Sequence, residues 1–259
     1  MAGSKREREL ARAKYERQST KRAASAHRHR QRVQMVTAVV VGVLVVVGVV
    51  ALARTIPSAS GTTAGSASST ANAAGAICEY RPHPTAARPV TAPPTTAPTT
   101  PATSAVDIVL DGKTVTVDLL RSKAPCTVSS FVSLANQKYF DKTPCHRLVK
   151  SAGLNVLQCG DPTGTGTGGP GYDFSDENLE GATYKAGTVA MANSGPNTNG
   201  SQFFIVWKDS QLPPSYAPFG TVTAGLDVVQ AIAAKGIKGG GEDGAPAKPV
   251  TIDRVVPAG

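Results

Sequence analysis

The sequence predicts a mainly β domain over residues 105–259, a closed eight-stranded antiparallel barrel capped by two helices. Two observations predict this fold class. Eight short runs of apolar and β-branched residues are separated by turn-forming residues, and only two stretches repeat their apolar residues at helical spacing. Strands and helices do not alternate, so a parallel sheet of βαβ units is excluded and an antiparallel sheet closed on itself is favoured.

The expected strands are short and lie between turn signals. They span residues 106–110, 114–119, 146–149, 154–158, 188–191, 202–207, 218–223 and 250–256. The first two flank Asp111-Gly112, a dipeptide typical of a tight hairpin turn.

The two helices are expected over residues 125–137 and 226–234. The first begins at Pro125, whose fixed φ suits the first helical turn. The side chains expected to face the core are Val128, Phe131, Val132 and Leu134 in the first helix and Val228, Val229 and Ile232 in the second.

Residues 1–34 and 35–53 differ from the rest of the chain. The first segment contains eleven Lys and Arg against three Glu, so it carries eight of the nine net positive charges. The second contains nineteen residues without a charge, dominated by Val, which is about the length of a membrane-spanning helix. By the positive-inside rule we expect a single-pass cell-membrane protein with residues 1–34 in the cytoplasm and the domain outside. Because the remainder is nearly neutral, no nucleic-acid binding is expected.

Cleavage of a signal peptide is the alternative, because Ala51-Leu52-Ala53 has the small-x-small form that signal peptidase recognises. In that case the domain is secreted. The basic segment and the apolar run are both longer than in usual signal peptides, so an uncleaved anchor is favoured.

Residues 54–104 are rich in Ser, Thr, Ala, Gly and Pro and are expected to form a disordered linker, because such residues bury too little apolar surface to fold. Residues 77–80 are the exception, since they combine an aliphatic residue, a cysteine and an aromatic residue. We expect this short segment to dock on the folded domain.

The chain has four cysteines, Cys78, Cys126, Cys145 and Cys159. An even number in a region expected outside the cytoplasm favours two disulfides, with buried free thiols as the alternative. Cys145 and Cys159 lie on neighbouring expected strands, but regular alternation places them on opposite faces, so the pairing is left open. No metal site is expected, because no Cys-x-x-Cys spacing occurs.

A loop dense in Asn, Gly and Ser runs directly into an apolar strand at residues 191–206. Alternation along that strand places Gln202 and Phe204 on one face and Phe203 and Ile205 on the other. An amide and an aromatic ring are therefore expected side by side on one surface of the sheet.

Two further motifs lie upstream and one downstream: His146-Arg147, then Gln158-Cys159-Gly160-Asp161, and later Phe219-Gly220. Together with residues 191–206 they resemble the cyclophilin family of peptidyl-prolyl cis/trans isomerases, over roughly residues 105–257. The chain is similar in particular to membrane-anchored actinobacterial members. The resemblance implies the same barrel, isomerase activity on proline-containing polypeptide segments, and no cofactor.

The resemblance also implies roles for single residues. Arg147 corresponds to the guanidinium that approaches the prolyl bond, and Gln158 is implied to orient it. The implied substrate-binding residues are Phe204, Gln202, Met191, Ala192, Asn193, Leu212, Tyr216 and Leu154. His146 is expected to be a buried, hydrogen-bonded structural histidine rather than an acid or a base.

The chain departs from the family pattern at three places. Eleven residues separate His146 from Gln158 where the family has eight, and the family's pocket Phe is replaced by Asn155, so either Leu154 takes its place or the pocket is shallower. Gln211 stands where many members have Trp, so tight cyclosporin binding is not expected.

A glycine-rich loop spans residues 164–171. It lacks the Gly-Lys-Ser/Thr sequence of a phosphate-binding loop, and no helix follows it, so it is expected to be a mobile surface loop beside the groove. In the resembled family this loop borders the substrate, which allows a contact from Thr165 or Thr167.

Two functions are consistent with these residues. The first is a membrane-tethered isomerase that assists the folding of exported proteins at the outer face of the membrane. The second is a non-catalytic module or chaperone that holds proline-containing segments, which Asn155 and the longer connection before Gln158 favour.

Overall fold

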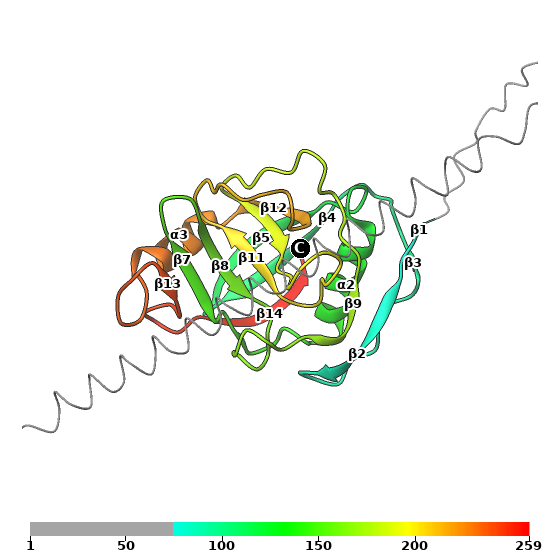
Figure 1. Ribbon diagram of the computed structural model, residues 1–259, viewed down its shortest axis with the longest axis horizontal. Helices are drawn as coiled ribbons and strands as arrows, with labels where there is room; N and C mark the ends of the chain where they lie inside the picture. Colours follow the sequence, from blue (N-terminus) through cyan, green and yellow to red (C-terminus); the bar gives the residue numbers. More distant parts are fainter. Residues whose placement is uncertain (1–74, 259) are drawn as a thin grey trace, which may run out of the picture. The chain divides into compact units, whose positions relative to one another are not determined.

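The computed structural model describes residues 75–258 (Figure 1). The basic segment 1–34, the apolar segment 35–53 and linker residues 54–74 lie outside the described residues. In the part that is described, no helix is both long enough and apolar enough to cross a membrane.

The described residues contain fourteen strands and two helices. The strands are β1 (Ala76–Ile77), β2 (Tyr80–Ala86), β3 (Thr96–Ala97), β4 (Ser104–Leu110), β5 (Lys113–Leu119), β6 (Thr143–Pro144), β7 (Arg147–Lys150), β8 (Asn155–Cys159), β9 (Pro170–Phe174), β10 (Thr188–Met191), β11 (Phe203–Val206), β12 (Pro218–Ala224), β13 (Asp243–Gly244) and β14 (Thr251–Pro257). The helices are α2 (Pro125–Asn136) and α3 (Leu226–Ala234).

Ten of these strands form one antiparallel sheet in the order β13-β7-β8-β11-β10-β12-β5-β4-β14-β6. Its eight longer strands are the eight predicted from the sequence, and β6 and β13 add two residues each at its ends. The prediction of a mainly β domain with two helices is therefore confirmed.

The predicted closure of the barrel takes a different form. The sheet is curled, and its pairing runs unbroken from β13 to β6. Its two sides meet through the chain itself: β6 pairs with β14, β7 pairs with β8, and only Cys145 and His146 separate β6 from β7. The Cys145 N–H also donates to the Val250 carbonyl at 2.9 Å. A continuous chain segment, rather than a ladder of hydrogen bonds, joins the edges.

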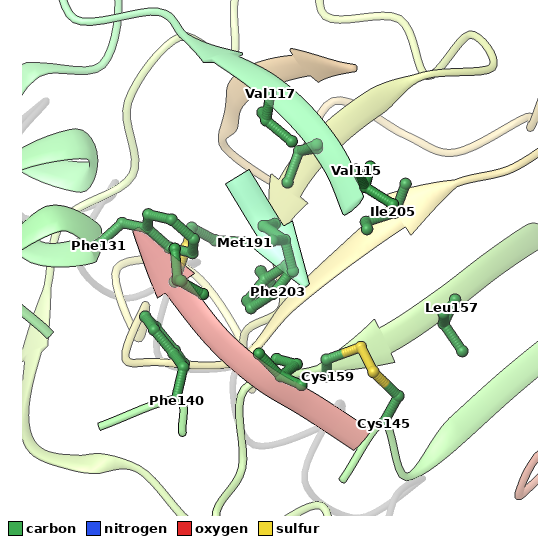
Figure 2. Close-up of a cluster of buried hydrophobic side chains, with 14 of the residues drawn as sticks. Val115, Val117, Phe131, Phe140, Cys145, Leu157, Cys159, Met191, Phe203 and Ile205 are labelled. Atoms are coloured by element: carbon green, nitrogen blue, oxygen red, sulfur yellow. A yellow bond between two sulfur atoms is a disulfide. The ribbon is translucent and has the colours of Figure 1, made fainter. Parts of the chain in front are cut away.

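Helix α2 covers the inner face of the sheet, as its apolar spacing predicts (Figure 2). The ring of Phe131 lies 5.0 Å from that of Phe140, 5.3 Å from Phe203 and 5.2 Å from Phe219, measured between ring centroids. Val128, Phe131 and Leu134 are buried and Val132 is partly buried. In α3, Val229 is buried and Val228 and Ile232 are partly buried against the same core.

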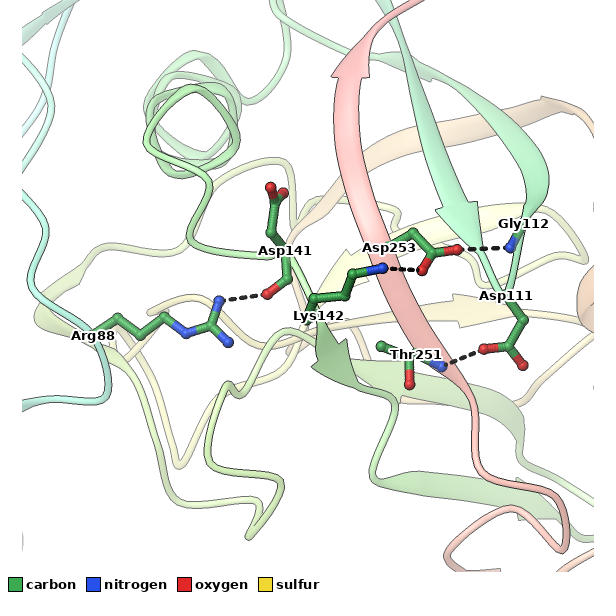
Figure 3. A network of polar contacts seen from close by, with 7 residues as sticks. All are labelled: Arg88, Asp111, Gly112, Asp141, Lys142, Thr251 and Asp253. Carbon is green, nitrogen blue, oxygen red and sulfur yellow. Dashed lines mark hydrogen bonds and ion pairs between the residues drawn. The ribbon is translucent and has the colours of Figure 1, made fainter.

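Residues 75–103, which we call the strap, were expected to be coil, and this part of the linker prediction is wrong. Strand β2 pairs with β9, and the Tyr80 hydroxyl donates to the Cys126 carbonyl at 2.9 Å. Arg88 donates to the carbonyl of Tyr139 and to that of Asp141, and Figure 3 shows the second bond. The predicted docking of residues 77–80 is confirmed for Cys78 and Tyr80, whereas Ile77 is 82% exposed.

Polar contacts fix the turn between β4 and β5 to the last strand (Figure 3). The Asp111 carboxylate accepts from the Thr251 N–H at 3.0 Å. Asp253 accepts from the Gly112 N–H and from Lys142, both at 2.7 Å. These contacts hold β14 in register at the point where the sheet curls back toward β6.

All four cysteines are paired, Cys78 with Cys126 and Cys145 with Cys159. The expectation that Cys145 and Cys159 face opposite sides of the sheet is wrong, because Cys145 lies in the break between β6 and β7 where alternation is interrupted. Both cysteines belong to the inner core cluster (Figure 2).

The two disulfides are expected to stabilise the domain unequally, because the loops that they close differ in length. The sequence separations are 48 for Cys78–Cys126 and 14 for Cys145–Cys159. The loop-entropy relation gives about 4 kcal/mol for the first and about 3 kcal/mol for the second.

This order can be measured by denaturant unfolding with and without reductant. In the Cys145→Ala/Cys159→Ala variant the loss on reduction reports only the Cys78–Cys126 bond, and in Cys78→Ala/Cys126→Ala it reports only the other. A larger loss in the second variant would contradict the order.

Candidate functional site

Four residues lie in one row across four neighbouring strands. Arg147 of β7 pairs with Gln158 of β8, Gln158 pairs with Phe204 of β11, and Phe204 pairs with Ala190 of β10. Side chains of directly paired residues project from the same face of a sheet. Arg147, Gln158 and Phe204 therefore project from one face of the sheet.

The two faces of the sheet carry separate apolar clusters, as alternation requires. Phe203 and Ile205 belong to the inner core, whereas Phe204 and Val206 belong to an outer cluster. The buried members of this outer cluster are Val149, Val156, Tyr184, Ala190, Phe204 and Val206, and its partly buried members are Leu154, Ala182, Ala192, Leu212 and Tyr216.

A hollow of about 130 Å³ opens over the outer cluster. It is lined by Arg147, Leu154, Val156, Gln158, Ala192, Asn193, Phe204, Leu212 and Tyr216. The guanidinium therefore borders the same space as the ring of Phe204, which is 4% exposed.

The floor of the hollow is held by aromatic packing. The ring of Tyr216 meets that of Phe204 edge to face, with centroids 5.7 Å apart and an angle of 79° between the planes. The hydroxyl of Tyr184 donates to the Tyr216 carbonyl at 2.8 Å and accepts from the Tyr216 N–H at 3.0 Å. A buried hydroxyl thus fixes the backbone that carries one wall of the hollow.

Arg147 is held by two partners. Its Nε donates to Oδ1 of Asp243 at 2.8 Å and its Nη2 donates to Oδ2 at 2.6 Å, which is the bidentate arrangement of guanidinium and carboxylate. Its Nη1 donates to Oε1 of Gln158 at 3.1 Å. The hydrogen bond between Arg147 and Asp243 raises the pKa of the guanidinium and lowers the pKa of the carboxyl.

Two amides continue the hydrogen bonds away from Arg147. Nε2 of Gln158 donates to Oε1 of Gln202 at 2.9 Å, and Nε2 of Gln202 donates to the Gly168 carbonyl at 3.0 Å. The Arg147 guanidinium can only donate, so Gln158 must turn its amide oxygen toward it. The Gly168 carbonyl can only accept, so Gln202 must turn its amide nitrogen toward that carbonyl. The predicted contact of Gln158 with Arg147 is confirmed.

Of the sequence-predicted residues, Gln202 and Met191 do not line this hollow. Gln202 lines a second hollow of about 280 Å³, which shares Gln158, Ala192 and Asn193 with the first. Met191 is 2% exposed and lies in the inner core, so its prediction as a wall of the pocket is wrong. Alternation explains this, because Met191 pairs with the inward-facing Phe203.

Val156 and Asp243 are site residues that were not expected from the sequence. Val156 has the same parity as Gln158 along β8, so alternation alone could have placed it on the outer face. No alternation pattern could place Asp243, because β13 is only two residues long and lies in a glycine-rich segment.

Asn155 is buried and does not line the hollow. Its carbonyl accepts from the Trp207 N–H, and its own N–H donates to Ser210 Oγ. Leu154 lines the hollow instead, which is one of the two arrangements expected from the sequence.

The longer β7–β8 connection reaches Gln211, whose N–H donates to the Gly153 carbonyl at 2.7 Å. The weak cyclosporin binding expected from Gln211 stays a prediction.

The glycine-rich loop is folded around a single carboxylate. The side chain of Asp161 accepts hydrogen bonds from the N–H groups of Thr163, Gly166 and Gly168. Burial by itself would raise the pKa of Asp161, but these hydrogen bonds and that of the Thr163 hydroxyl lower it. A Cβ at Gly168 would clash with Oδ1 of the hydrogen-bonded Asp161 carboxylate, so glycine is required there. The donors that a phosphate would need are already used by the protein's own carboxylate.

His146 lies beneath this loop. A Cβ at Gly166 would lie 3.5 Å from Cδ2 and Nε2 of its ring. Neither buried ring nitrogen has a hydrogen-bond partner among residues 75–258, so the expectation of a hydrogen-bonded histidine is wrong. Burial lowers the pKa of His146, partly offset by Asp161.

Three comparisons relate the chain to known proteins. Residues 105–256 match the family model described as "Cyclophilin type peptidyl-prolyl cis-trans isomerase/CLD". Over 197 residues the chain is 48% identical to the probable peptidyl-prolyl cis-trans isomerase B of Mycobacterium tuberculosis, a match that covers 70% of this chain and 64% of that protein. Over 194 residues it is 46% identical to the Mycobacterium leprae protein of the same name, with 69% and 66% covered. The match thus spans less than two thirds of the length of each of these two relatives.

Solved structures give the same relationship. A crystal structure of a Cryptosporidium parvum cyclophilin-type peptidyl-prolyl cis-trans isomerase aligns with a TM-score of 0.55 and 30% identity, covering 61% of this chain and 98% of that one. A second crystal structure of that protein, in the presence of the dipeptide Ala-Pro, aligns with a TM-score of 0.54 and covers 60% and 99%.

The half-buried His146 is expected to make stability depend on pH near neutrality. Its folded-state pKa lies below the unfolded value near 6.5, so the unfolded chain binds more protons between these two values. The free energy of unfolding should therefore fall as pH is lowered through 6.5, by at most about 1.4 kcal/mol per pH unit.

Urea unfolding at several values between pH 7.5 and 5.5 measures this slope. The His146→Phe variant removes the titrating group and should lose most of the slope. An unchanged slope in that variant would contradict the assignment to His146.

Proposed function

This chain belongs to the cyclophilin-type family of peptidyl-prolyl cis-trans isomerases, and we propose that it isomerises X-Pro bonds in polypeptide segments. One observation of the structure supports this most directly. The guanidinium of Arg147 and the buried ring of Phe204 border the same hollow. A cation that can bond to an amide therefore stands beside an apolar surface that can hold a proline ring.

The chemistry needs no bond to be made or broken. Rotation about the prolyl C–N bond is slow because the amide loses its resonance, which costs about 20 kcal/mol. In the twisted transition state the nitrogen lone pair is no longer delocalised and accepts a hydrogen bond better than the planar amide does. A donor placed at that nitrogen therefore stabilises the transition state more than the ground state.

Arg147 is the proposed donor. Of the five N–H groups of its guanidinium, Asp243 takes two and Gln158 takes one, so two remain for the substrate. The guanidinium stays charged at any physiological pH, and its planar fork holds the direction of the remaining donors.

The proposed pocket for the proline ring lies between Phe204, Leu212, Tyr216 and the aliphatic side chains of Leu154 and Val156. These residues offer contact surface without competing for the amide. A crystal structure of the Cryptosporidium relative was obtained in the presence of Ala-Pro, which supports a proline-containing substrate for this fold.

The second hollow is proposed to hold the substrate residues that precede or follow the proline. It shares Gln158, Ala192 and Asn193 with the first and continues over the backbone of residues 166–171. His83 of the strap also lines it. Residues that the sequence assigned to a linker therefore border the proposed groove.

Replacement of the proposed donor tests the function. Arg147→Ala should lower the rate of cis-to-trans isomerisation of a short proline peptide more than tenfold, because the transition state loses its charged hydrogen bond. A protease-coupled assay of the full chain measures this rate. Lys142→Ala is the control, since Lys142 is also ion-paired but does not line the hollow.

Full activity in Arg147→Ala would contradict the proposed role of the guanidinium. A wild-type rate equal to that of buffer, together with binding of the peptide, would instead favour the alternative of a non-catalytic module that holds proline segments.

We also propose that residues 35–53 anchor the chain in the cell membrane, with residues 1–34 in the cytoplasm and the domain outside, where it would assist the folding of exported proteins. The charge-free stretch and the excess of Lys and Arg before it support this topology. The pairing of all four cysteines in disulfides is typical of proteins outside the cytoplasm.

Cell fractionation tests the anchor. The full chain should stay in the membrane fraction after an alkaline carbonate wash, whereas a chain that lacks residues 35–53 should not. Recovery from the medium of a chain that begins just after Ala53 would show cleavage of a signal peptide and contradict the anchor.

A further inference from the structure

The carboxylate of Asp243 accepts hydrogen bonds from the Nε and Nη2 side of the Arg147 guanidinium, whereas Gln158 binds Nη1. Both carboxylate oxygens take part, at 2.8 Å and 2.6 Å, and they engage Nε and Nη2. Gln158, the partner implied by the family resemblance, contributes a single longer bond of 3.1 Å to Nη1. By geometry and charge, Asp243 is the stronger partner of the arginine.

Asp243 comes from a segment that the fold holds in place. Strand β13 pairs with β7, so that Asp243 lies opposite Val149 and Gly244 opposite Leu148 (Figure 1). The Lys150 N–H donates to the Glu242 carbonyl at 2.8 Å, one residue further along the same pairing. The carboxylate is thus carried on an edge strand of the sheet rather than on a free loop.

The segment that delivers β13 is closed at its base. The Lys238 N–H donates to the Ala245 carbonyl and the Ala247 N–H donates to the Gly236 carbonyl, both at 2.8 Å. Ile237 is 7% exposed and joins the inner core. Gly239, Gly240 and Gly241 have φ angles of 79°, 81° and 97°, so glycine suits the turn between these contacts.

The ion pair is too exposed to serve mainly as a source of stability. The side chain of Arg147 is 40% exposed and that of Asp243 is 51% exposed, and pairs of this kind contribute little to folding. An arginine side chain is, however, among the most flexible, and a bidentate partner removes most of that freedom before a substrate arrives.

We propose that Asp243 is a positioning residue for the isomerase reaction: it holds the Arg147 guanidinium over the hollow in the orientation that the twisted prolyl amide requires. Asp243 does not compete with the substrate, because two N–H groups of Arg147 remain unused by Asp243 and Gln158. This inference rests on the proposed function, since it assigns a partner to the proposed catalytic donor.

Kinetics of Asp243→Ala and Asp243→Asn in the full chain test the proposal. Both variants are expected to lose about tenfold in kcat, while KM changes less than about twofold, because the ring pocket is untouched and only the transition-state contact is weakened. The matched control is Asp253→Asn, another ion-paired carboxylate whose partners Lys142 and Gly112 do not line the hollow. It should keep the wild-type kcat.

A second measurement does not depend on turnover. In an NMR spectrum of the free chain, the Nε–H of Arg147 should give a resonance protected from exchange with water, identified by its loss in Arg147→Lys. Asp243→Ala should abolish that protection while the melting temperature changes by only about 2 °C, as expected for loss of an exposed ion pair.

The outcomes separate the two claims. If the wild-type chain is inactive, the proposed function fails. If the wild type is active but Asp243→Ala keeps its kcat, gains activity, or loses activity through KM alone, Asp243 is not a positioning residue. Nε–H protection that persists without Asp243 would also overturn the proposal.

Discussion

The proposed site depends on one unbroken series of hydrogen bonds that crosses the outer face of the sheet. It runs from the Asp243 carboxylate through the Arg147 guanidinium and the amides of Gln158 and Gln202 to the Gly168 carbonyl. Each group in the series has only one orientation that satisfies its neighbours. A flexible cation is thereby given a fixed direction, which the proposed electrostatic stabilisation of a twisted amide requires.

The sheet separates this polar series from the inner apolar core and leaves it beside the outer apolar cluster. Its inner face packs on α2 through Phe131 and Phe203, while its outer face presents Phe204 beside Arg147. The Cys145–Cys159 disulfide joins the chain just before Arg147 to the chain just after Gln158. The strap adds a further layer through Cys78–Cys126 and brings His83 to the second hollow. Elements far apart in the sequence therefore converge on the groove.

Local patterns predicted most of this structure, and long-range contacts account for the rest. Apolar alternation located the eight longer strands and placed Phe204 and Phe203 on opposite faces of the sheet, since both follow from neighbours in the chain. The order of the strap was not expected from the sequence, because residues 75–103 depend on partners far along the chain, in β9 and α2, in addition to the pairing of β1 with β3. The Cys145–Cys159 pairing was missed because an irregularity at Cys145 breaks the alternation on which the argument relied. Asp243 was not expected at the site, because it lies almost a hundred residues from Arg147 and outside the motifs that carry the family resemblance.

In our account the groove catalyses cis/trans isomerisation of a prolyl bond in addition to binding the proline-containing segment. Two-dimensional NMR exchange spectroscopy of a short Ala-Pro peptide, with the full chain added in catalytic amount, measures this most directly. Uncatalysed exchange takes tens to hundreds of seconds, so our account predicts cross-peaks between the cis and trans proline resonances at mixing times of about one second. Proline resonances that shift or broaden on binding without such cross-peaks would contradict it.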